Sequence, residues 1–123
     1  MRAIVVALAT LALLAGCGGG GAGGGTAQPS GSIKVTMTEY KFDPSTIPAP
    51  AGKVVFFLVN AGTTAHDMVI RDSTGKRLFA SELVSAGDSF VFTVPSLPAG
   101  TYTIFCDQPG HEASGMKGTL NIT

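Results

Sequence analysis

From residue 32 onward, short runs of apolar or alternating residues are separated by turn-forming clusters. Residues 33–37 and 100–106 alternate between apolar and polar, which is typical of strands with one buried face. Residues 54–59 are continuously apolar, as expected for a strand packed between two sheets. The remaining pattern predicts strands over 66–70, 89–94 and 116–122, an extended edge segment over 47–50, turns over 41–45 and 51–52, and either a strand or a helical turn over 77–84.

Roughly seven short strands without a helical period predict an all-β fold, an antiparallel β-sandwich or barrel. We expect Pro95 and Pro98 to end the strand that begins at residue 89, because proline lacks a donor for the sheet. In the strand over 100–106, the alternation directs Tyr102, Ile104 and Cys106 to the same inward face. Cys106 would therefore lie at the rim of the core.

The first 31 residues have a different character. Arg2 precedes an apolar run over 3–15 that is shorter than the ~20 residues needed to span a bilayer, which indicates a secretory signal. Leu-Ala-Gly-Cys at 14–17 resembles the lipobox of bacterial lipoproteins, which implies cleavage after residue 16 and lipid on Cys17; the alternative is an ordinary signal peptide cleaved nearby. We predict a signal peptide over 1–16, a lipidated cysteine and Gly-rich tether over 17–31, and one domain over 32–123.

The composition limits the partners of this domain. Eight basic and eight acidic residues give no net charge, so nothing favours nucleic acid as a ligand. The chain has two cysteines, and acylation of Cys17 would leave Cys106 without a partner in the chain. Metal ligation is the leading explanation for such a lone cysteine.

A thiol, an imidazole and a thioether follow one another at intervals of five residues, as Cys106, His111 and Met116. The chain has only two histidines, and the other one, His66, opens a predicted strand. A soft thiolate, imidazoles and a weak thioether form the donor set preferred by a copper ion that cycles between Cu(I) and Cu(II). The four residues therefore predict a site for one copper ion at one end of the barrel.

These residues, together with Asn60-Ala61-Gly62 and the segments around His66 and Cys106, resemble the cupredoxins, the small blue copper proteins. The Cys-x4-His-x4-Met spacing is most similar to that of auracyanins, rusticyanin and sulfocyanins. The resemblance covers residues 32–123 and implies an eight-stranded Greek-key β-barrel, one type 1 copper ion and one-electron transfer. It also implies that His66, Cys106 and His111 are equatorial ligands and that Met116 is the axial ligand.

Three further residues are predicted to surround the ligands: Ala65, Asp67 and Gln108. Asp67 stands where such families usually have asparagine, and we expect it to connect the two ligand loops and to offer its backbone N–H to the cysteine sulfur. Gln108 is not proline, so its N–H is available for a second hydrogen bond to sulfur. A carboxylate favours Cu(II) and donors to the thiolate favour Cu(I), so the net effect on the potential stays open.

The preferred functional hypothesis is a membrane-tethered electron carrier, monomeric and extracytoplasmic (periplasmic or at the cell surface). It would exchange electrons with a redox donor and acceptor of a respiratory or photosynthetic chain, which dock transiently near His111. The alternative is a lipoprotein for copper delivery or storage. A copper enzyme would need a second, histidine-rich copper site, and the chain has no third histidine. A binuclear copper site would need a second cysteine at position 110, where Gly110 stands.

Overall fold

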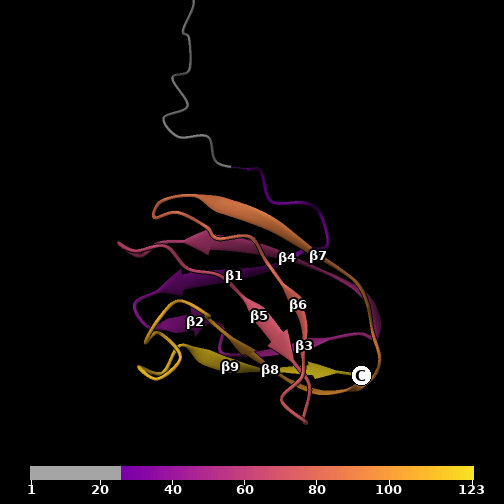
Figure 1. Cartoon of the computed structure of the whole chain (residues 1–123). Coiled ribbons are helices and arrows are strands. Elements are labelled where there is room, and N and C mark those ends of the chain that lie inside the picture. The colour runs from indigo at the N-terminus through magenta and orange to yellow at the C-terminus, as the bar shows by residue number, and fades with distance from the viewer. Residues whose placement is uncertain (1–25) are drawn as a thin grey trace, which may run out of the picture.

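The computed structural model describes residues 26–123, which form nine strands in two packed sheets and contain no helix in that range (Figure 1). The strands are β1 (Ile33–Thr38), β2 (Lys41–Asp43), β3 (Thr46–Ala49), β4 (Gly52–Asn60), β5 (Val69–Arg71), β6 (Arg77–Ala80), β7 (Ser89–Leu97), β8 (Gly100–Phe105) and β9 (Lys117–Ile122). One sheet has the order β2-β1-β4-β7, and the other has the order β3-β9-β8-β5-β6. The all-β fold class is confirmed.

Both sheets are mixed, which corrects the expectation of a wholly antiparallel arrangement. β1 pairs with β4 in parallel, and β3 pairs with β9 in parallel. The chain crosses to the other sheet at β3 and returns at β4, so that β4 runs beside β1 in the same direction.

The core fills the space between the sheets with side chains from almost every strand. Tyr102, Ile104 and Cys106 are all buried, as the alternation over 100–106 predicts, but Phe105 between them is buried as well. The largest fully buried side chains include Phe42, Phe56, Met37, Leu58, Met68 and Leu120. A core packed from two sheets holds the strand ends firmly, and Cys106 and Met116 directly adjoin the ends of β8 and β9.

Several predicted elements differ from the structure in extent. Residues 41–43 form a strand, β2, where a turn was predicted. The strand predicted over 66–70 begins only at Val69; His66 instead makes an isolated bridge with Val84. Residues 77–80 are a strand, which settles the ambiguity of that segment.

β7 continues through Pro95, where it was predicted to end, and stops at Leu97, directly before Pro98, as expected. β7 is the last strand of its sheet and pairs only with β4, so a missing N–H is tolerated there. The register against β4 shifts between Gly52 and Val54, next to the proline. The predicted edge segment with Pro48 is β3, which does lie at the edge of its sheet.

The predicted signal peptide, Cys17 and the tether up to residue 25 lie outside the described residues. From Thr26 onward the chain runs along the domain, and the hydroxyl of Ser89 donates to the carbonyl of Thr26 at 3.2 Å. In the described part of the chain, no helix has the length and apolar character needed to cross a bilayer.

Candidate metal centre

Three donor atoms converge at one end of the sandwich. Nδ1 of His66 lies 3.2 Å from Nδ1 of His111, and the sulfur of Cys106 lies 3.9 Å and 3.5 Å from these two nitrogens. A metal ion held at about 2.1 Å by three donors in a trigonal plane would keep those donors about 3.6 Å apart. The observed spacing fits such an ion without a large movement of any side chain.

Cys106 and His66 are positioned by strand β8 and by the backbone bridge to Val84. Cys106 follows β8 directly, and the strand's alternation turns its side chain into the core. His66 is held by two backbone hydrogen bonds with Val84: its N–H donates at 3.1 Å and its carbonyl accepts at 2.8 Å. Both side chains are completely buried.

The loop over 106–116 closes on itself through its backbone. The N–H of Cys106 donates to the carbonyl of Met116 at 3.1 Å, and the N–H of Met116 donates to the carbonyl of His111 at 3.0 Å. The N–H of His111 donates in turn to the backbone carbonyl of Gln108 at 3.0 Å. Gly110, with a φ of 79°, allows the tight turn that precedes the histidine. The backbone therefore connects three of the predicted ligands, and the side chain of Met116 is fully buried.

Burial is the main cause of the pKa shifts of Cys106 and His66. Desolvation raises the pKa of the Cys106 thiol, while the backbone N–H groups of Asp67 and Gln108 act in the opposite direction by favouring the thiolate. Desolvation also lowers the pKa of His66, which keeps its imidazole neutral and available as a ligand. A bound cation would offset the cost of forming the thiolate in this buried place.

Asp67 connects the two loops that carry the donors. Its carboxylate accepts a hydrogen bond from the N–H of Asp107 at 2.7 Å. Ala65, the third residue predicted near the ligands, is half-buried beside His66.

Two residues that support the site, Glu39 and Asn60, were not predicted to do so from the sequence. The Oε1 atom of Glu39, in the turn between β1 and β2, lies 3.1 Å from Nε2 of His66. Asn60 was noted only as part of a family motif; its buried amide donates to the carbonyls of Thr64 and Val84, at 2.8 Å each. The family motif could have drawn attention to Asn60. No local pattern marks Glu39, which is 27 residues before the histidine.

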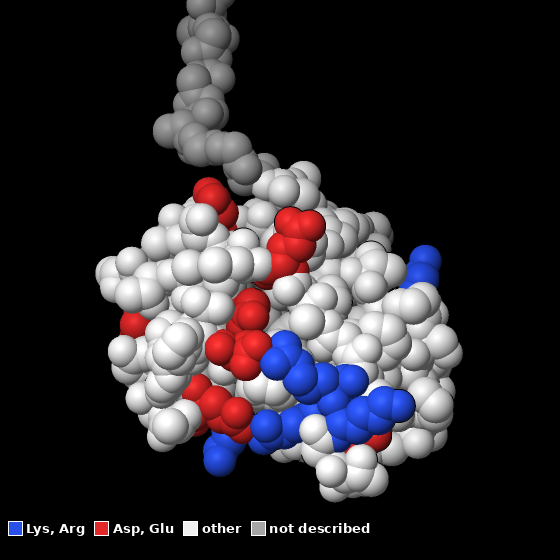
Figure 2. All heavy atoms as spheres, in the orientation of Figure 1, with Lys and Arg blue, Asp and Glu red and all other residues white. Residues whose placement is uncertain are grey.

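Tyr40 contacts the half-buried His111, and two ion pairs join the loop that carries His111 to β5 and β6. The ring of Tyr40 meets the ring of His111 edge to face, with centroids 4.9 Å apart, and Figure 1 shows the turn between β1 and β2 beside the loop between β8 and β9. Arg71 pairs with Glu112, and Arg77 pairs with Asp107 at 2.8 Å. Figure 2 shows acidic and basic side chains adjoining one another on the face in view.

The comparisons with known proteins agree with this architecture. Residues 3–121 match the model of the cupredoxin-like domain, so the chain belongs to the cupredoxin-like family. Auracyanin-B of Chloroflexus aurantiacus is 40% identical over 50 residues, which are 41% of this chain but only 21% of that protein. Plastocyanin of Scenedesmus fuscus is 31% identical over 87 residues, 66% of this chain and 85% of its own. The copper-resistant cuproprotein CopI of Rubrivivax gelatinosus is 26% identical over 113 residues, 78% of this chain and 68% of its own.

Solved structures show the same fold. Auracyanin from Roseiflexus castenholzii superposes with a TM-score of 0.67 at 21% identity, covering 78% of this chain and 99% of that one. Plastocyanin from Dryopteris crassirhizoma superposes with a TM-score of 0.56 at 26% identity, covering 74% of this chain and all of its own. The family binds one copper ion, and the thiolate, imidazole and thioether donors found here suit copper better than a hard cation.

Proposed function

We propose that this protein is a mononuclear type 1 copper protein that carries single electrons between redox partners. The observation that supports this most directly is the convergence of His66, Cys106 and His111, whose ligand atoms all lie within 4.8 Å of one another. His66 and Cys106 are fully buried and come from separate parts of the sandwich, so their positions depend on the packed core and change little when the charge at the site changes.

Each ligand has a distinct part. Cys106 would provide the thiolate, the Nδ1 atoms of His66 and His111 would provide the two imidazole donors, and Met116 would provide the weak thioether donor. Bound copper supplies the Cu(II)/Cu(I) couple. The backbone N–H groups of Asp67 and Gln108, which favour the thiolate form of Cys106, stabilise its negative charge.

The electron would enter and leave at His111. This side chain is half-buried, whereas His66 and Cys106 are fully buried. Pro109, Gly110 and Ala113 are exposed around it, and so is the ring of Tyr40. A small patch of this kind suits a transient redox encounter that buries less than ~1,200 Å² in total.

The proposal includes a tether and a compartment. The sequence at 14–17 supports lipid on Cys17 after removal of residues 1–16, with residues 17–31 linking the lipid to the domain over 32–123. The domain would then work as a monomer on the extracytoplasmic side of a membrane. Lipid attachment can be tested by mass spectrometry of the mature N-terminus, in which an unmodified Cys17 would contradict the tether.

Copper delivery or storage is the second candidate function. The similarity to the copper-resistant cuproprotein CopI, over 78% of this chain, favours it. The complete burial of Cys106 and His66 argues for retention of the metal, because exchange is faster at exposed ligands.

Visible absorption and electron paramagnetic resonance spectra of the full chain in detergent, with one equivalent of Cu(II), test the proposal. We expect an intense thiolate-to-copper band that bleaches reversibly with ascorbate, together with narrow parallel hyperfine splitting. The Cys106→Ser variant is the control and should lose the band while keeping its β-sheet circular dichroism. A pale wild-type solution with wide splitting would contradict electron transfer and favour copper handling.

A further inference from the structure

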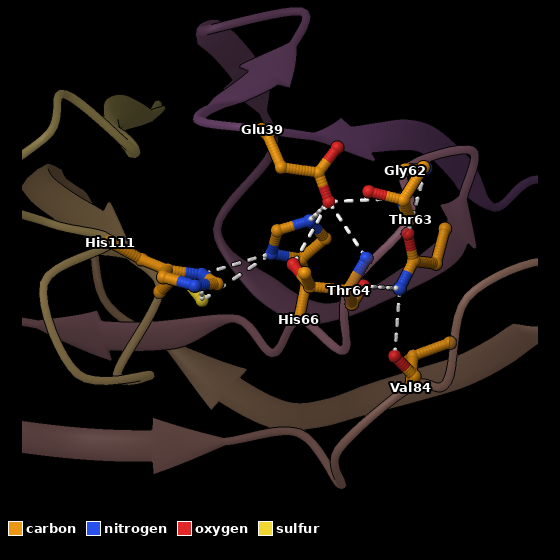
Figure 3. A network of polar contacts seen from close by, with 9 residues as sticks. Glu39, Gly62, Thr63, Thr64, His66, Val84 and His111 are labelled. Atoms are coloured by element: carbon orange, nitrogen blue, oxygen red, sulfur yellow. Dashed lines mark hydrogen bonds and ion pairs between the residues drawn. The ribbon is translucent and has the colours of Figure 1, made fainter.

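Glu39 places one carboxylate oxygen at the centre of a set of hydrogen bonds beside His66. Its Oε1 accepts from the N–H of Thr63 at 2.9 Å, and from the N–H and hydroxyl of Thr64 at 2.8 Å and 2.9 Å. The same oxygen lies 3.1 Å from Nε2 of His66. Figure 3 shows the carboxylate on one side of the His66 ring and His111 on the other.

The loop over 61–65 is shaped to receive this carboxylate. A Cβ atom at Gly62 would lie 2.6 Å and 2.7 Å from the two carboxylate oxygens, so a larger residue there would displace Glu39. Asn60 holds the loop in place, since it accepts from the N–H of Gly62 at 2.9 Å and donates to the carbonyl of Thr64. Glycine at 62 and a buried amide at 60 together leave space for one acidic side chain.

The carboxylate decides which nitrogen of His66 carries the proton. Oε1 of Glu39 accepts three hydrogen bonds from Thr63 and Thr64, so it acts as an acceptor at this position and offers no proton to His66. Nε2 of His66 must therefore carry the proton. A neutral imidazole has one N–H, so Nδ1 keeps its lone pair, and Nδ1 is the atom that faces Cys106 and His111.

We propose that Glu39 is a positioning residue of the copper site, which fixes the ring and tautomer of His66 and favours Cu(II) over Cu(I). The inference rests on the proposed function, because it takes His66 as a copper ligand. A carboxylate that accepts the outer N–H of a metal-bound histidine raises the basicity of the ligating nitrogen. Its negative charge adds to this preference for the more highly charged ion.

The test uses the full-length protein and the variants Glu39→Ala and Glu39→Gln. The first removes the acceptor, and the second keeps the shape and an acceptor oxygen but removes the charge. Gly62→Ala displaces the carboxylate while leaving its chemistry unchanged. Glu112→Gln is the matched control, since it removes a carboxylate that lies next to His111 in the sequence and pairs with Arg71 rather than with a histidine.

The first measurement is nitrogen NMR of the His66 ring in the metal-free protein. We expect a proton on Nε2 in the wild type and in Glu112→Gln, and a mixture of tautomers in Glu39→Ala and Gly62→Ala. The second measurement is Cu(II) affinity, which should fall about tenfold or more in Glu39→Ala, as is usual for such an outer partner. A tenfold loss of Cu(II) over Cu(I) binding would raise the potential by about 59 mV.

Glu39→Gln should keep the tautomer and show a smaller rise in potential than Glu39→Ala. The inference would be overturned by a wild-type His66 protonated on Nδ1, or by Glu39 variants whose tautomer, affinity and potential match those of the wild type. Equal shifts of the potential in Glu39→Gln and Glu112→Gln would also overturn it. They would mean that any nearby negative charge has the same effect, whether or not it contacts His66. A wild type without the thiolate band would contradict the copper assignment alone, since the tautomer is measured without metal.

Discussion

The two histidines of the site are held in different ways. His66 is fully buried, and its backbone N–H and carbonyl both form hydrogen bonds with Val84. Glu39 fixes the Nε2 atom of its ring. His111 is half-buried in a loop whose own backbone turns hold it, and Tyr40 contacts the edge of its ring. His66 is thus held by residues distant in the sequence, whereas His111 depends mainly on its neighbours.

This difference separates two tasks that a redox site must perform. A buried, constrained ligand keeps the geometry of the site constant, and this keeps the reorganisation on electron transfer small. A ligand near the surface brings the site within reach of a partner. Under the proposed function, His66 serves the first task and His111 serves the second.

Replacing each histidine by alanine should destabilise the protein to different extents. In the metal-free protein, His66→Ala should lower the free energy of unfolding by about 3 kcal/mol, because it leaves a cavity in the core. His111→Ala should cost about 1 kcal/mol or less, as expected for a partly exposed side chain. Urea unfolding measures both values, and equal losses would contradict the division between the two sides.

Asn60 offers a second test of the His66 side. Asn60→Ala should cost about 2 kcal/mol, because the carbonyls of Thr64 and Val84 and the N–H of Gly62 lose their partner. Asn121→Ala is the control: Asn121 is half-buried in β9 and makes a 3.5 Å contact with Thr101. The two variants should differ clearly in the free energy of unfolding measured with urea. Similar losses would argue against a loop over 61–65 that Asn60 stabilises.

Met116 tests the axial position on the other side. Met116→Leu keeps nearly the same volume, so the fold and the blue colour should persist. Loss of a donor that favours Cu(II) should raise the potential, by about 59 mV for a tenfold change in relative affinity. Met68→Leu, at another fully buried methionine, should leave the potential unchanged. Cyclic voltammetry gives both numbers, and an unchanged or lower potential for Met116→Leu would exclude the axial assignment.

The smallest effect is expected at the ion pairs that connect the loop over 106–116 to β5 and β6. Arg77 and Asp107 are about half exposed, so Arg77→Ala should cost about 0.5 kcal/mol or less, and the cost should shrink further in salt. Arg71→Ala should cost more, about 1 kcal/mol, because its guanidinium lies 4.4 Å from the ring centre of Phe105, against 5.8 Å for that of Arg77. A loss at Arg77 as large as that at Asn60 would mean that the loop depends on the ion pair more than on its own backbone.

Several parts of the site could be predicted from the sequence. The spacing of Cys106, His111 and Met116 is local, and the alternation of β8 places Cys106 on the inward face whatever the other strands do. His66 could be assigned because the chain has only one other histidine. The parallel pairing of β1 with β4 could not be predicted, since it depends on the path of the chain between sheets. The strand through Pro95 likewise depends on the edge position of β7.

The sequence by itself determined which candidate donors the chain offers, the inward direction of Cys106 and the length of the loop that carries three of these donors. These follow from residue types and from repeats of two or five positions, which are properties of short stretches of chain. Only the tertiary structure decided that Glu39 binds the outer nitrogen of His66, that Gly62 leaves room for its carboxylate, and that one histidine is buried while the other is partly exposed. Such contacts join residues far apart in the sequence, and the packing of two sheets brings them together.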